Sequence, residues 1–252
     1  MVNIDRVYQK VLALANKEQR GYITPQEFNL FADHAQMEIF EQYFYDINQW
    51  TKQGGNQHSY SDMLTNLQEK IDLFNTFKNV DIVNNVGNVE MKDIKNIYRL
   101  GMVNVHYSGE NESVTAEYQT WDESMKYGNS KLTAWSKKMP VYNRRLTTGG
   151  VKIIKIRPFP APHTIVSGVK TYTDIVQLFY TKKPSKPNWA YIVVNDKPLY
   201  NATSAVNFEL HESEETELVY RILALAGIAI EKPQLTQIAA GLQGAQIQQE
   251  KQ

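Results

Sequence analysis

Apolar positions in the first fifty residues follow helical spacing. The pattern predicts a helix over 3–18, which Gly21 ends with a positive φ. Thr24, Pro25 and Glu27 carry the N-cap, first-turn and capping-box signals of a second helix over 25–50. This helix bears two apolar stripes, Phe28, Phe31, Ala35, Ile39 and Tyr43 on one side and Leu30, Met37, Phe40, Phe44 and Ile47 on the other. Such a helix is either the centre of an intramolecular bundle or has one stripe buried against another subunit.

The remaining pattern predicts one more helix, a β-rich middle and a helical end. The third helix covers 61–77, and the β-prone runs that follow are 80–83, 97–107, 141–145, 151–157, 175–181 and 189–195. We expect Lys182–Pro187 to be an exposed hairpin tip. After Phe208 the helical period returns and ends at Gly227. Pro233 then opens a Gln-rich segment whose apolar stripe is too narrow for a stable helix alone.

The order of these elements predicts an α+β protein, with an N-terminal helical layer, a central and mostly antiparallel β region, and C-terminal helices. The corresponding regions are 1–78, 79–208 and 209–252. The stretch 108–150 is too irregular for its elements to be assigned from periodicity.

Composition narrows the class of protein. The 252 residues include 42% apolar side chains, enough for a large core, and equal numbers of basic and acidic residues, 27 of each. A balanced charge disfavours polyanion binding through a long-range field, although local basic patches can still act. The absence of cysteine excludes disulfides and thiolate-bound metals. No apolar run has the length of a membrane span and no export signal opens the chain, so we expect synthesis in the cytosol without export or membrane contact.

Both ends of the chain resemble virion structural proteins of tailed phages. The resemblance rests on Val7–Phe31 and Ile39–Asp46, and on Phe208–Leu218, Ile222–Gly227 and the Gln-rich finish Ile247–Gln252. Within that group the chain is most similar to neck proteins of crAss-like and related short-tailed phages, the adaptor or ring proteins below the portal. The resemblance implies a ring of about twelve copies that joins portal to tail, with helices around a DNA channel. It also implies contacts with the portal and other neck or tail proteins, and a location in the virion after assembly in the bacterial cytoplasm.

The sequence lacks the residue types and spacings that catalytic or metal-binding motifs require. Asn16–Phe28 can be aligned with a calcium-binding loop, but Arg20 would place a cation where a ligand oxygen is required. The five histidines are far apart in the sequence and show no metal-ligand spacing. No nucleophile elbow or phosphate loop is present, since Gly149-Gly150 precedes a predicted strand rather than a helix. We therefore expect a protein that is not an enzyme and holds no metal or cofactor.

Clusters of like charge have two interpretations each. The basic clusters are Lys137-Lys138, Arg144-Arg145 and Lys182-Lys183-Lys186, which are typical of solvated strand ends but could also contact an acidic partner or passing DNA. The acidic group within 212–217 is typical of a helix start and could also face a basic neighbour.

The sequence thus favours a non-enzymatic ring protein of the head-to-tail connector. The residues expected to pack against a neighbouring subunit are Phe40, Phe44 and Ile47, and those expected to dock the C-terminal segment are Leu235, Ile238 and Leu242. Two alternatives remain open, ahead of a third, an enzyme of unrecognised type for which the sequence assembles no nucleophile, base or metal. One is another virion component, such as a capsid decoration, tail-tube or cargo protein. The other is a carbohydrate-binding β-domain that stacks sugars on Tyr142, Tyr172, Trp189 or Tyr191.

Overall fold

The computed structural model describes most of the chain. The described residues are 1–17, 23–53, 58–80, 82–83, 88–90, 96–130, 132–146, 152–161, 164–166, 169–171, 174–229, 241–242 and 244–245. The predicted turn at Gly21 therefore lies outside the described residues, as does most of the Gln-rich segment.

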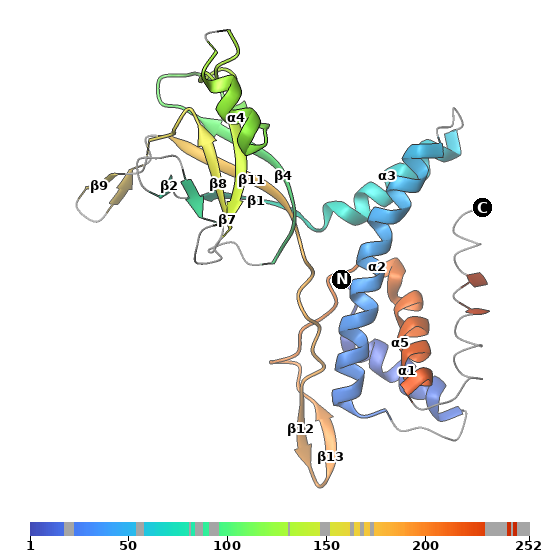
Figure 1. The fold of residues 1–252 in the computed structure, drawn as a ribbon. Helices are drawn as coiled ribbons and strands as arrows, with labels where there is room; N and C mark the ends of the chain where they lie inside the picture. Colours follow the sequence, from blue (N-terminus) through green and yellow to red (C-terminus); the bar gives the residue numbers. More distant parts are fainter. Residues whose placement is uncertain are drawn as a thin grey trace. The chain divides into compact units, whose positions relative to one another are not determined.

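The chain divides into two compact units, which together give the predicted α+β class (Figure 1). The helical unit consists of Met1–Phe74 and Pro184–Gln252, and the sheet unit consists of Asn75–Lys183. This division differs from the three consecutive regions expected from the sequence. The stretch from Pro184 onward belongs with the N-terminal helices, because its apolar residues share their core.

The helical unit contains α1 (Ile4–Lys17), α2 (Pro25–Gln53), α3 (His58–Asp72), the 3₁₀ turn η2 (Glu212–Glu214) and α5 (Glu215–Ala229). The predicted capping box at the start of α2 is confirmed. Thr24 Oγ1 accepts a hydrogen bond from Glu27 N–H at 3.3 Å, and the Glu27 carboxylate accepts from Thr24 N–H at 2.9 Å. Helix α5 continues past Gly227, so the predicted stop there is wrong.

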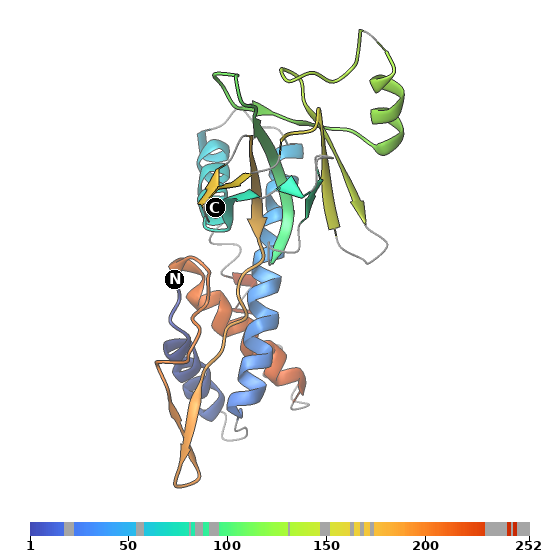
Figure 2. The ribbon, with the colours of Figure 1, turned by 90° about the vertical axis from the view of Figure 1, so that its left-hand side faces the viewer.

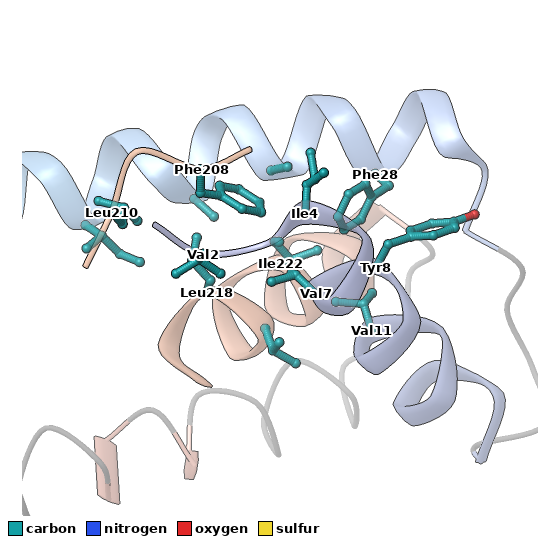
Figure 3. Packing of buried hydrophobic residues seen from close by; sticks show 14 of the residues in the cluster. Val2, Ile4, Val7, Tyr8, Val11, Phe28, Phe208, Leu210, Leu218 and Ile222 are labelled. Atoms are coloured by element: carbon teal, nitrogen blue, oxygen red, sulfur yellow. The ribbon is translucent and has the colours of Figure 1, made fainter. Parts of the chain in front are cut away.

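Helix α2 is the centre of an intramolecular bundle. Its first stripe packs against α1 and α5, and Figure 3 shows Phe28 of α2 near Ile4 of α1 and Ile222 of α5. Its second stripe is largely used as well, since Phe40 is fully buried and Phe44 packs against the same core. The two-sided pattern is thereby explained within one chain. Leu30 is the member of the second stripe that is clearly exposed.

The acidic group at the start of α5 is also used inside the unit. Three of its carboxylates are buried and form ion pairs with basic side chains of neighbouring turns or helices. The pairs are Glu214 with Lys70, Glu215 with Arg6 and Lys10, and Glu217 with Arg221. The interpretation that this group faces a basic neighbour therefore does not hold for these three residues.

The sheet unit contains two main sheets. One has the order β1-β11-β4-β5 and the other the order β2-β3-β8-β7-β6. Their strands are β1 (Asn75–Val80), β2 (Ile82–Val83), β3 (Asn88–Glu90), β4 (Ile97–His106), β5 (Val114–Thr115), β6 (Glu117–Tyr118), β7 (Val141–Leu146), β8 (Lys152–Arg157) and β11 (Ile175–Lys182). Pairing is antiparallel except between β6 and β7. A core drawn from both sheets includes Val103 and Leu178 of the first and Ile154 and Ile156 of the second.

Smaller elements complete the chain. Strands β9 (Thr164–Val166) and β10 (Val169–Thr171) form a separate pair, and helix α4 (Trp121–Gly128) falls in the stretch that periodicity did not assign. Thr120 and Glu123 form a second reciprocal capping box at its start.

The predicted hairpin tip at Lys182–Pro187 is wrong. Ser185 is bonded to the helical unit, because its carbonyl accepts from Gln36 Nε2 at 2.8 Å and its hydroxyl donates to Glu209 at 2.9 Å. The hairpin lies further along, between β12 (Tyr191–Val194) and β13 (Lys197–Tyr200).

Glu215 should make the stability of the helical unit depend on pH. Burial alone would raise the pKa of its carboxyl, but hydrogen bonds and charges from Lys10 and Arg6 outweigh burial and lower it. A lowered pKa contributes stability that is complete above the unfolded value of about 4.3 and is lost as pH falls through the folded value. Glu215→Gln should therefore cost on the order of 1 to 3 kcal/mol at neutral pH.

This cost should shrink as the pH falls below the unfolded value of about 4.3 and through the lowered folded pKa of Glu215, because the wild-type carboxylate is then protonated too. Melting temperatures of both proteins at neutral and acidic pH measure it. The control is Glu212→Gln, which removes the same charge from an exposed side chain of the preceding turn. A difference between wild type and variant that does not change with pH would contradict the prediction.

Candidate functional site

The hairpin β12-β13, called the hairpin arm below, is anchored at its root by Trp189. The indole is buried and stacks between helix and arm, with its ring centroid 4.3 Å from that of Tyr8, 5.9 Å from Tyr191 and 5.7 Å from Tyr200. Trp189 Nε1 donates to Asp5 Oδ1 at 2.9 Å, and its backbone N–H donates to Asn29 Oδ1 at 2.7 Å. Aromatic packing and hydrogen bonds to α1 and α2 together fix where the arm begins.

The turn of the arm has the backbone that a tight hairpin needs. Asn195 and Asp196 have φ values of 49° and 61°. Two consecutive positive φ values match a type I′ turn, and Asn and Asp tolerate this region better than other residues with a side chain. Figures 1 and 2 both show the arm extending beyond the ends of α1 and α2.

One face of the arm carries exposed aliphatic side chains together with Lys197. Ile192 pairs with Leu199, and Val194 lies on the same face two residues further along. The exposed fractions of Ile192, Val194 and Leu199 are 56%, 46% and 55%. An isolated two-stranded hairpin is marginally stable in water, and an aliphatic face gains free energy when another surface covers it. The arm is therefore the surface of the helical unit best suited to contact a partner.

The residues predicted from the sequence to form an interface lie elsewhere. Phe40 is fully buried, with its ring 5.1 Å from Phe44 and 4.8 Å from Phe74, so it has no surface to offer a neighbour. Phe44 and Ile47 are partly buried against the same core. Leu242 is exposed in a short helical piece, while Leu235 and Ile238 lie outside the described residues.

A cavity of about 370 Å³ opens between α2, α3 and the start of α5. It contains His211 and Ser213, a pair that the sequence analysis did not single out. His211 Nδ1 accepts from Ser213 N–H at 3.3 Å and also lies 2.9 Å from the Ser213 hydroxyl oxygen, and that hydroxyl donates to Glu214 at 3.2 Å. Activation of a serine requires its hydroxyl to donate to the imidazole. A hydroxyl has one proton, which here goes to the Glu214 carboxylate, while the imidazole accepts from Ser213 N–H as the cap of η2. The arrangement is that of a helix cap.

Two of the proposed sugar-stacking residues are not accessible. Tyr142 and Trp189 are both buried, and Tyr191 stacks on Trp189. Tyr172 lies outside the described residues. A sugar would need an exposed ring face, which Tyr142 and Trp189 do not offer.

Among the described residues, no three or more His, Asp or Glu side chains are grouped so that they could hold a metal ion. The described helices likewise include none with the length and apolar character needed to cross a membrane.

Trp189 should be critical for the helical unit. Trp189→Ala should lower the free energy of unfolding by about 3 to 5 kcal/mol, because it leaves a large cavity between helix and arm. Trp189→Phe keeps much of the packing and should cost less, although it loses the hydrogen bond to Asp5. Urea denaturation followed by circular dichroism measures both values. Phe77→Ala, which truncates an exposed aromatic ring, is the control, and an equal cost for Phe77→Ala and Trp189→Ala would contradict the assigned anchor.

No protein-family model matches the chain, and no curated protein has a significantly similar sequence.

Proposed function

We propose that the chain is a non-enzymatic structural protein of a tailed-phage virion and acts as a homo-oligomeric ring in the head-to-tail connector. The resemblance of both chain ends to neck proteins supplies the biological setting. In this setting the protein works through its interfaces, binding further copies of itself and neighbouring portal or tail proteins.

The observation that carries the proposal is the hairpin arm. Its root is held by a buried tryptophan, and its free part exposes Ile192, Val194 and Leu199 on one face. A rigid root reduces the conformational entropy lost on association, and the aliphatic face supplies the favourable free energy. A projecting arm that contacts a different surface of the next copy forms a heterologous interface, the type that closes into rings.

Another virion role, such as capsid decoration, tail tube or cargo, would use the same arm. Labelling of the protein in intact particles followed by electron microscopy distinguishes these roles, because the connector proposal requires the label at the portal vertex. Label spread over the capsid or along the tail would reject the connector role.

Self-association is tested on the purified protein by mass photometry and negative-stain electron microscopy. Wild type should form rings, and Ile192→Ser combined with Leu199→Ser should remain monomeric with an unchanged melting temperature. Loss of two buried aliphatic side chains, each worth about 1.5 to 3 kcal/mol, should weaken each contact by about a hundredfold or more.

The matched control is Leu132→Ser, which makes the same change at an exposed leucine of the sheet unit. It should leave the rings intact. A wild-type protein that stays monomeric at every concentration would contradict the proposal, as would rings that form equally well without Ile192 and Leu199.

A further inference from the structure

The two units carry opposite charge. The sheet unit has 16 Lys and Arg residues against 9 Asp and Glu, a formal net charge of +7. Since the whole chain has 27 of each, the helical unit carries a net charge of −7. The chain as a whole is neutral, but its sheet unit is basic. A net positive charge of this size is typical of domains that bind polyanions.

Part of this positive charge lies on one face of the second sheet. Strands β7 and β8 pair with Asn143 opposite Lys155 and Val141 opposite Arg157. Paired residues share a face and successive residues alternate, so Arg145, Lys155 and Arg157 lie on the same face. Arg144 and Lys152 lie on the opposite face, which carries the core residues Ile154 and Ile156.

Aromatic rings are interleaved with these cations. Arg145 stacks over Trp121 with 4.3 Å from guanidinium carbon to ring centroid, and Arg157 lies 4.7 Å from the centroid of Trp135. Lys155 Nζ is 5.3 Å from the centroid of Phe159. Arg145, Lys155, Arg157, Trp121, Trp135 and Phe159 together form the cationic face.

Local packing holds this face in place. An added Cβ at Gly128 would lie 1.9 Å from the Trp135 ring, so the indole packs directly on the end of α4. Arg157 is 7% exposed and both of its terminal nitrogens point to Met125 Sδ at 3.4 Å. Thioether and ring contacts position the guanidinium but supply no negative charge.

The described part of the chain supplies no counterion to the charges on the cationic face. Among the described residues, none of its three cations forms an ion pair within 4.0 Å. Burial and the repulsion of Arg157 and Arg145 lower the pKa of Lys155, as expected when cations gather without an anion. Buried charges are ordinarily paired, so an uncompensated guanidinium favours an external anion.

Hydrogen-bonding capacity is also unused here. Asn143 is 2% exposed on the same face, and neither atom of its amide has a hydrogen-bond partner among the described residues. Arg157 Nε is likewise unpartnered within the described part of the chain. The face thus combines positive charge and exposed rings with unpartnered polar atoms buried next to them.

We propose that the cationic face binds single-stranded nucleic acid, with Arg145 and Lys155 contacting phosphates, the buried Arg157 adding positive charge behind them, and the aromatic and guanidinium planes stacking on bases. Arginine matches phosphate oxygens in a bidentate geometry, and stacking on rings or guanidinium planes is the usual mode for unpaired bases. A duplex offers phosphates but hides its base faces, so the aromatic side chains favour the single strand. This inference is independent of the proposed ring.

Fluorescence anisotropy with a labelled oligothymidylate of about 20 nucleotides tests it on the full chain. Binding should weaken as salt rises from about 50 to 200 mM. Arg145→Ala and Lys155→Ala should each raise Kd by about fivefold or more and reduce the log–log salt slope by about 0.7. Arg144→Ala and Lys152→Ala are matched controls on the same two strands, and should change Kd by less than about twofold because they lie on the other face.

Circular dichroism establishes that each variant is folded. Because there are two test variants and two control variants, the comparison can still be made if one variant does not fold. Absence of binding by wild type would overturn the proposal. Equal losses in all four variants would overturn it too, since they would show a diffuse charge effect. Tighter binding of a duplex of the same length, or equally effective competition by polyglutamate, would assign the face to a different partner and reject the single strand.

Discussion

The helical unit depends on closure between two distant parts of the chain. Val2 and Phe208 are both fully buried and form an isolated antiparallel bridge, in which Phe208 N–H donates to Val2 carbonyl oxygen at 3.2 Å. This bridge brings α5 against α1 and α2, so the apolar sides of all three helices share one core (Figure 3). The whole sheet unit lies within the sequence interval that the bridge spans. Without this closure α2 would keep one apolar side exposed.

Closure also determines what the unit offers to other molecules. It uses Phe40, most of the second stripe of α2 and the carboxylates at the start of α5 for internal packing and ion pairing. The hairpin arm keeps exposed apolar side chains, since its root is fixed by Trp189 while Ile192, Val194 and Leu199 remain about half exposed. The surface available for assembly therefore depends on which side chains are already used for packing and ion pairing inside the unit.

Local signals in the sequence predicted the elements well. The capping residues Thr24 and Glu27 located the start of α2, and β-branched runs located strands such as β4 and β8, because both signals act within a few residues. Long-range pairing was not accessible in this way. The return of Pro184 to the helical unit depends on tertiary contacts, and the separation of Arg144 from Arg145 onto opposite faces depends on the register of β7. The net charge of the whole chain likewise did not reveal that the two units carry opposite charge. Their charges could not be counted separately before the boundaries of the units were known.

The interrupted sequence of the helical unit sets the order in which the units can form during synthesis. The sheet unit is one continuous stretch, so all of its strands have been made once Lys183 has left the ribosome. The helical unit must wait for Phe208, Leu218 and Ile222, which complete the core around α2. During that interval α1 and α2 have been synthesised but their apolar sides are uncovered, which makes the nascent N-terminal helices the segment most in need of protection by a chaperone.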